Sequence, residues 1–197
     1  MGLNYSYLLF FERDHVWDAL HGIAQVSNQH QPPTKIIFPD GQIFIPLEPY
    51  SSNLAEMHHT DRKLDFQIVM KFPVEDQEII KYNRSELDLT SGNQIAIGYI
   101  YLTVYLNDRI RSSQDYVLFE FYSACTTMSY LFEKSASVQK GFIELLTNHH
   151  GVSGALDREL DGGRLFWFRG KEIDVDMFAY NTPDQIASLL AGDNENG

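Results

Sequence analysis

The most regular hydrophobic pattern in the chain lies between residues 64 and 72, where apolar and polar side chains alternate. The apolar positions are Leu64, Phe66, Ile68, Met70 and Phe72. A period of two is typical of a strand with one buried face and one face in water, and such strands are usually antiparallel. This segment therefore predicts an antiparallel strand that packs on the core.

The longest apolar run, residues 95–106, predicts a strand with bulky side chains on both faces. After a polar turn, residues 116–122 predict its partner, with one apolar and one amphipathic face. A strand that is bulky on both faces belongs in the interior of a sheet, so we expect these two strands to be central. Residues 5–11 are also apolar on both faces and are a further candidate for the interior.

Spacings of three and four residues indicate the helices. An apolar stripe over residues 14–27 predicts a helix that Asp14 caps. A second stripe runs through residues 126–149 and fits one long helix or two helices broken near residues 135–137. The glycine-rich residues that follow, 151–163, are expected to form a loop.

Turn residues indicate two hairpins, over residues 35–47 and 165–176, and residues 184–191 predict a short last helix. The predicted fold class is α+β, with a mostly antiparallel or mixed sheet whose central strands are 95–106 and 116–122. Helices near 14–27 and 126–149 pack against it. We expect a single domain over residues 1–191, followed by a disordered acidic tail, residues 192–197.

Composition places the chain among folded globular proteins, because 44% of its 197 residues are hydrophobic. The single cysteine, Cys125, cannot form an internal disulfide, which favours a reducing, cytoplasmic setting. It matches no nucleophile motif, and we expect a structural, buried thiol. No apolar run reaches the roughly 18 to 20 residues that span a bilayer, so no membrane association is expected.

The net charge limits the classes of partner that the chain can attract. With 27 acidic and 15 basic residues, the formal charge is −12 at pH 7. Attraction to nucleic acid or to an anionic membrane is therefore not expected as a main function. The charge fits a solvated surface or a basic protein partner.

Loop histidines are the first candidates for chemistry. His58, His59 and Asp61 lie close together, and a second pair, His149 and His150, follows the predicted long helix. Imidazoles and carboxylates suit zinc or manganese, so a composite metal site is conceivable. The spacing matches no known metal motif, and polar loop histidines are usually ordinary surface residues.

The last predicted hairpin is a candidate partner-binding surface. Glu172, Asp174 and Asp176 share one strand face, and Trp167 lies in the neighbouring strand. Aromatic side chains anchor protein interfaces while charges steer the partner. The alternative is that Trp167 belongs to the core and the carboxylates are simply solvated.

Tyr99, Tyr101 and Tyr105 share one face of the predicted central strand. A row of tyrosines can close the core at its rim or line a ligand pocket. The first arrangement is the commoner one, because aromatic side chains mostly pack.

The chain carries neither a Gly-x-Ser-x-Gly elbow nor a phosphate-binding loop, so an enzyme is not favoured. The first hypothesis is an acidic intracellular protein that binds a partner, as a regulator, inhibitor or immunity-type factor does. The alternative is a metal-dependent hydrolase that uses the loop histidines with zinc or manganese. A second alternative is small-molecule binding in the tyrosine-lined pocket.

Overall fold

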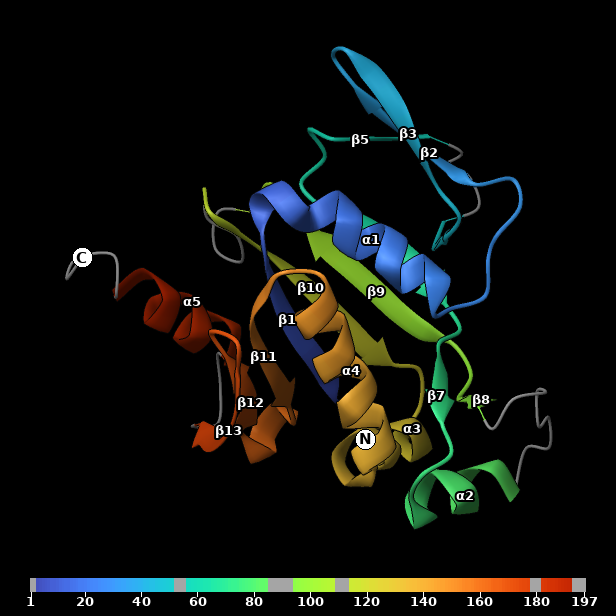
Figure 1. Cartoon of the computed structure of the whole chain (residues 1–197), viewed down its shortest axis with the longest axis vertical. Coiled ribbons are helices and arrows are strands. Elements are labelled where there is room, and N and C mark those ends of the chain that lie inside the picture. Colours follow the sequence, from blue (N-terminus) through green and yellow to red (C-terminus); the bar gives the residue numbers. More distant parts are fainter. Residues whose placement is uncertain (1–2, 52–55, 85–93, 109–113, 178–181, 193–197) are drawn as a thin grey trace.

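The computed structural model describes residues 3–51, 56–84, 94–108, 114–177 and 182–192 (Figure 1). Residues 193–197 of the predicted acidic tail lie outside these ranges, whereas Gly192 is the last residue of the final helix. In chain order the elements are β1 (Ser6–Glu12), a short 3-10 helix η1 (Arg13–His15), α1 (Val16–Gln25), β2 (Thr34–Phe38), β3 (Gly41–Ile45), β4 (Glu48–Pro49), β5 (Glu56–His58), β6 (Leu64–Ile68), β7 (Lys71–Pro73), α2 (Gln77–Arg84), β8 (Gln94–Ala96), β9 (Ile100–Tyr105), β10 (Tyr116–Ser123), α3 (Thr126–Lys134), α4 (Ala136–Asn148), β11 (Gly151–Asp157), a second 3-10 helix η2 (Glu159–Asp161), β12 (Gly163–Phe168), β13 (Lys171–Met177) and α5 (Thr182–Gly192).

The main sheet has eight strands in the order β13-β12-β11-β1-β10-β9-β6-β4, and all its neighbours are antiparallel. β1 and β10 lie at its centre, and β1 is buried from Ser6 to Phe11. The predicted α+β class and the interior position of β1 and β10 are confirmed. A parallel pair, β2 with β5, occurs in a separate three-stranded sheet, order β3-β2-β5.

Two strands that the sequence predicts as continuous are interrupted. Residues 94–96 form β8, which pairs with β7 in a small sheet of its own, whereas β9 lies in the main sheet. The break contains Gly98 with a φ of +93°, a conformation that glycine adopts at little cost. The segment 64–72 is likewise divided into β6 and β7, yet Met70 and Phe72 remain buried.

Three helices cover one face of the main sheet. Figure 1 shows α1 and α4 in front of the central strands, with α3 beside the lower end of α4. Their apolar stripes pack on the side chains that point to this face, such as Leu9, Phe119 and Leu102. The stripe over residues 126–149 is two helices, because Ser135 ends α3 and caps α4 by accepting a hydrogen bond from the backbone N–H of Val138 (3.2 Å).

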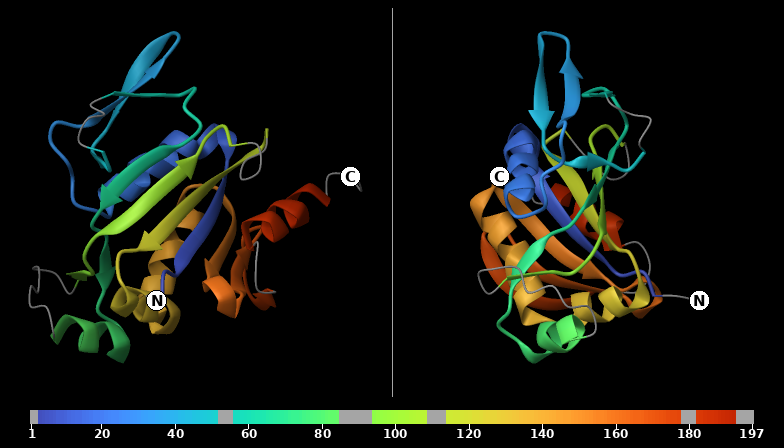
Figure 2. Two further views of the ribbon diagram at one scale, coloured as in Figure 1. Left: turned by 180° about the vertical axis from the view of Figure 1, so that it is seen from behind. Right: turned by 90° about the vertical axis from the view of Figure 1, so that its right-hand side faces the viewer.

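The opposite face is covered only in part. Ile186 and Leu190 of α5 pack on Leu8, Leu118 and Ala155, which point away from α1 and α4. Over β6 and β9 no helix of the described residues covers this face, as the view from behind shows (Figure 2).

The glycine-rich segment expected as a loop is the strand β11, paired with β1 on one side and β12 on the other. The prediction of a loop was wrong because these glycines serve close packing rather than a turn. A Cβ at Gly154 would lie 2.5 Å from Leu146 of α4 and 2.8 Å from Phe166. Glycine therefore lets α4 approach the sheet directly.

The remaining short elements follow the sequence closely. Both predicted hairpins form, as β2–β3 and β12–β13, and the last helix is α5. Cys125 is exposed at the start of α3, so the expected burial of this thiol was wrong. In the described part of the chain, no helix has both the length and the apolar character needed to cross a membrane.

Candidate functional site

The pairing of β1 with β11 brings two distant polar segments together. Phe11 lies opposite Gly151, and the backbone N–H of Glu12 donates to the carbonyl of His150 (3.5 Å). The residues that follow β1 therefore meet the residues that precede β11. Both segments are polar, and they form a cluster at the end of the helical layer.

We define the histidine cluster as Glu12, His15 and His150. Nε2 of His15 lies 3.6 Å from Oε2 of Glu12, and the rings of His15 and His150 are stacked with their centroids 3.8 Å apart. One ligand atom from each residue lies within 4.8 Å of the others. Within the described ranges, no other group of three histidine, cysteine or carboxylate side chains meets in this way.

His149 lies beside this cluster and faces α1. Gly22 of α1 leaves the space for its ring, because a Cβ there would collide with the imidazole. Burial lowers the pKa of His149, the charge of Asp18 acts in the opposite direction, and His150 adds to the lowering. Its surroundings thus favour the uncharged form of the His149 imidazole.

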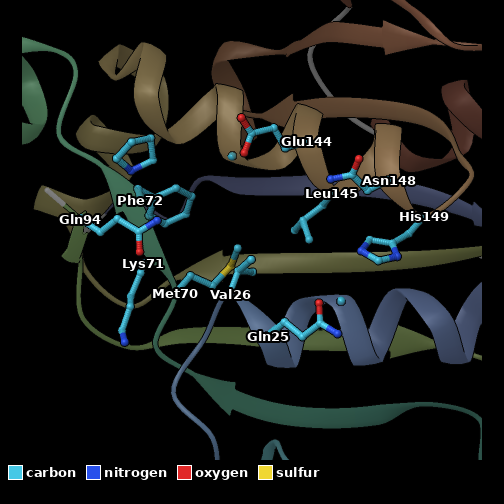
Figure 3. Close-up of a pocket in the computed structure, with 13 residues that line it drawn as sticks. Gln25, Val26, Met70, Lys71, Phe72, Gln94, Glu144, Leu145, Asn148 and His149 are labelled. Atoms are coloured by element: carbon cyan, nitrogen blue, oxygen red, sulfur yellow. The ribbon is translucent and has the colours of Figure 1, made fainter. Parts of the chain in front are cut away.

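His149 also lies at one end of a groove between α1, α4 and β7, with a cavity volume of about 290 Å³ (Figure 3). Met70, Phe72 and Leu145 give the groove apolar walls. Its polar and charged lining residues, besides His149, are Gln25, Lys71, Gln94, Glu144 and Asn148. Apolar walls with a few polar groups suit a small ligand or a single side chain of a partner.

The uncovered side of the main sheet carries a second group of polar and aromatic residues. Tyr101 and Tyr105 of β9 lie on this side, and the ring of Tyr101 contacts Tyr50 edge-on at 5.1 Å. Tyr105 donates a hydrogen bond to Glu120 of β10 (2.9 Å), which is buried. Ser6 of β1 also donates to Glu120 (3.3 Å).

Tyr122 of β10 is the cross-strand neighbour of Tyr101. Burial raises the pKa of the Tyr122 hydroxyl, and the charge of Glu120 and a hydrogen bond to it act in the same direction. Tyr99, the third residue of the predicted pocket, precedes β9 and is half exposed. Two of the three predicted pocket residues, Tyr101 and Tyr105, therefore share this face with Tyr50 and Tyr122.

The residues of the predicted loop cluster contact one another and the neighbouring strand β2. The carboxylate of Asp61 accepts a hydrogen bond from the backbone N–H of His58 (2.7 Å). A ring nitrogen of His59 lies 3.0 Å from the carbonyl of Ile37, and this ring stacks on Phe38. The structure brings His150 together with Glu12 and His15, and it does not bring His58, His59 or Asp61 into that ligand group.

In the predicted partner-binding hairpin, now β12 and β13, the aromatic residue is buried and two carboxylates are paired. Trp167 is only 7% exposed, and its indole N–H donates to the carbonyl of Gly151 (3.1 Å). Asp174 accepts two hydrogen bonds from Arg164 (2.7 and 3.1 Å), and Asp176 lies 3.5 Å from Arg158. Glu172 is exposed. The Trp167 indole thus belongs to the core, and Asp174 and Asp176 are each paired with an arginine.

Sequence reasoning missed Glu12 and His15 as site residues. Their spacing of three places them on one side of a helical turn, which is a weak signal by itself. The stronger signal was the pairing of residues 5–11 with residues 151–157, and it was hidden because β11 resembled a loop.

The fold and these surfaces define an α+β protein whose antiparallel sheet has one helix-covered face and one partly open face. Comparison of the chain with protein-family models, with curated proteins and with solved structures found no match.

Proposed function

We propose that this chain is a non-enzymatic binding protein that holds a basic protein partner on the uncovered face of its main sheet. The observation that carries the proposal is the grouping of tyrosines on this face. We call it the tyrosine face, defined by Tyr50, Asp65, Gln67, Tyr101, Tyr105 and Tyr122.

An antiparallel sheet with one wet face is ordinary, and its wet positions are commonly polar side chains. Here large aromatic rings occupy them, and Tyr50 is 60% exposed. Tyrosine offers a large apolar area, a polar tip and few rotatable bonds, so it loses little entropy when a partner binds. This is why tyrosine is enriched among the residues that dominate binding energy.

The chemistry of the partner follows from charge. Asp65 lies on the tyrosine face and accepts a hydrogen bond from Thr103 (2.7 Å), and the whole chain carries a net charge of −12. A basic surface is attracted to this protein from a distance and an acidic one is repelled. The burial of Trp167 removes the aromatic anchor from the β12–β13 hairpin, which favours the tyrosine face over that hairpin.

The enzymatic alternative requires His58, His59 and Asp61 to share a metal with His149 or His150. The contacts of Asp61 with His58 and of His59 with Ile37 and Phe38 are those of a packed turn. The geometry supports the binding function better.

The test is capture of a partner from the lysate of the source organism by immobilised protein at low salt. We expect Tyr50→Ala and Tyr101→Ala to weaken capture of a basic protein at least about tenfold, since each removes a central aromatic contact. Tyr130→Ala is the matched control, because Tyr130 is a similarly exposed tyrosine (52%) on α3. Failure to capture any basic protein, or equal capture by all three variants, would contradict the proposal.

A further inference from the structure

We propose that Glu12, His15 and His150 form a binding site for a divalent transition-metal ion, with zinc as the best-fitting ion. This site is separate from the tyrosine face and does not depend on the function proposed above. It lies where the end of β1 meets the turn between α4 and β11.

The donor atoms suit zinc in type and spacing. Zinc binds imidazole nitrogen and carboxylate oxygen at about 2.0 to 2.2 Å, so neighbouring ligand atoms of a tetrahedral site lie roughly 3.3 Å apart. Nε2 of His15 and Oε2 of Glu12 are 3.6 Å apart, a few tenths of an ångström from this value. An exposed glutamate can close that difference by a small side-chain rotation.

His150 supplies the third ligand. Its ring lies parallel to that of His15, with an interplanar angle of 16°. Stacked rings do not aim two lone pairs at one ion, so metal binding requires the His150 ring to turn about its Cβ–Cγ bond. The side chain is exposed, which leaves this turn free, and the backbone hydrogen bond from Glu12 keeps the residue in place.

The other nitrogen of His15 lies near a carboxylate that can fix its proton. Nδ1 is buried, makes no hydrogen bond among the described residues, and lies 3.6 Å from Oδ2 of Asp18. In many metal sites a carboxylate accepts the second ring N–H of the ligating histidine, which fixes the tautomer and directs the free lone pair at the ion. Asp18 is in position for this role as a positioning residue.

Three protein ligands leave one position of a tetrahedral zinc ion for water. Because Glu12 and His150 are both exposed, water reaches this position directly. A bound ion would join the β1–α1 junction to the α4–β11 turn, which are far apart in sequence. By mass action, any ion that binds only the folded chain raises its stability.

The experiment is a titration of metal-free, full-length protein with ZnCl₂, followed by calorimetry and by equilibrium dialysis for stoichiometry. We expect one zinc ion per chain. His15→Gln, His150→Asn and Glu12→Gln should each weaken binding by about tenfold or more, and Asp18→Asn by roughly 10- to 100-fold through His15. Asparagine at position 150 tolerates the positive φ of 58° that His150 adopts.

Two control variants discriminate between sites. His58→Ala/His59→Ala removes the other histidine pair, and His21→Ala removes an exposed histidine of α1, so both should bind zinc like the wild type. Melting curves without metal identify any variant that fails to fold. Because Glu12 and Asp18 are exposed, Glu12→Gln and Asp18→Asn test the site even if a histidine variant does not fold. No binding at millimolar zinc, binding that survives His15→Gln/His150→Asn, or binding lost in His58→Ala/His59→Ala would overturn the proposal.

Discussion

Single glycines decide how closely the helical layer approaches the sheet. At Gly154 the neighbouring atoms belong to Leu146 and Phe166, both fully buried, so neither side chain can move aside cheaply. Gly22 makes the same kind of space for His149, which is only half buried. The packing of α4 on β11 therefore depends on the absence of a side chain at position 154.

Gly154→Ala is expected to lower the free energy of unfolding by about 1–3 kcal/mol, because the added methyl overpacks the core between α4 and β12. Urea unfolding followed by circular dichroism measures the change. Gly41→Ala is the control, since no atom lies within 4 Å of a Cβ at this position. Equal stability of the two variants would show that α4 can shift away from β11.

The same residues show the limit of sequence reasoning at this scale. A glycine-rich segment looks the same whether glycine serves a turn or close packing, and only the position of Leu146 distinguishes the two. The contact between the rings of His15 and His150 likewise depends on strand pairing, which local sequence does not encode. Trp167 could be assigned to either face of its hairpin until the bulge between Leu165 and Trp167 was known.

At the scale of elements, one carboxylate joins two helices. Oδ1 of Asp76 accepts from the backbone N–H groups of Glu78 and Ile79 at the start of α2, and Oδ2 accepts from Ser135 and Ser137 at the start of α4. Burial alone would raise the pKa of Asp76, but these hydrogen bonds outweigh it and lower the pKa from 3.8 to about 2. The ionised carboxylate of Asp76 is thus the form that joins α2 to α4.

Because the folded-state pKa is lowered, the stability that Asp76 contributes is complete above about pH 4 and is lost as the pH falls toward 2. Asp76→Asn should therefore be less stable than the wild type by about 2 kcal/mol at pH 7, and the difference should shrink over that acidic range. Urea unfolding between pH 2 and pH 7 measures it. Asp40→Asn, in the exposed β2–β3 turn, serves as the control, and a pH-independent difference would contradict this role for Asp76.

Elements were predicted better than their connections. Periodicity of two and of 3.6 located the central strands and the helices on the covered face, because each pattern reports burial within one segment. Turn residues located both hairpins. Periodicity did not locate the interruption at Gly98, since Ile95 and Ile97 are buried although they lie outside β9. Because burial continues across this break in strand hydrogen bonding, a pattern of buried positions cannot reveal the break.

At the scale of the whole molecule, acidic groups outnumber basic ones enough to influence association with any charged partner. Several cations already have an acidic neighbour, such as Lys35 with Glu56 and Arg62 with Asp108. The excess charge therefore acts through the long-range field more than through pairs already formed.

Raising the ionic strength from about 0.02 M to about 0.5 M should slow association with a captured basic partner at least tenfold, while dissociation changes little. Stopped-flow or surface-based kinetics measure both rates. Asp40→Asn/Glu172→Gln, which reduces the net charge from −12 to −10, should show a weaker dependence on salt. An association rate that does not respond to salt would rule out electrostatic attraction as the source of partner choice.

The central position of β1 has a consequence for the growing polypeptide. Its two neighbours, β10 and β11, are translated roughly 100 residues or more after it, which takes about 5 to 30 seconds at ordinary elongation speeds. Throughout that interval β1, which is buried from Ser6 to Phe11 in the folded protein, has neither of its partner strands. Nascent chains halted before β11 is made would leave one edge of β1 open, and an unpaired apolar edge can associate with other chains.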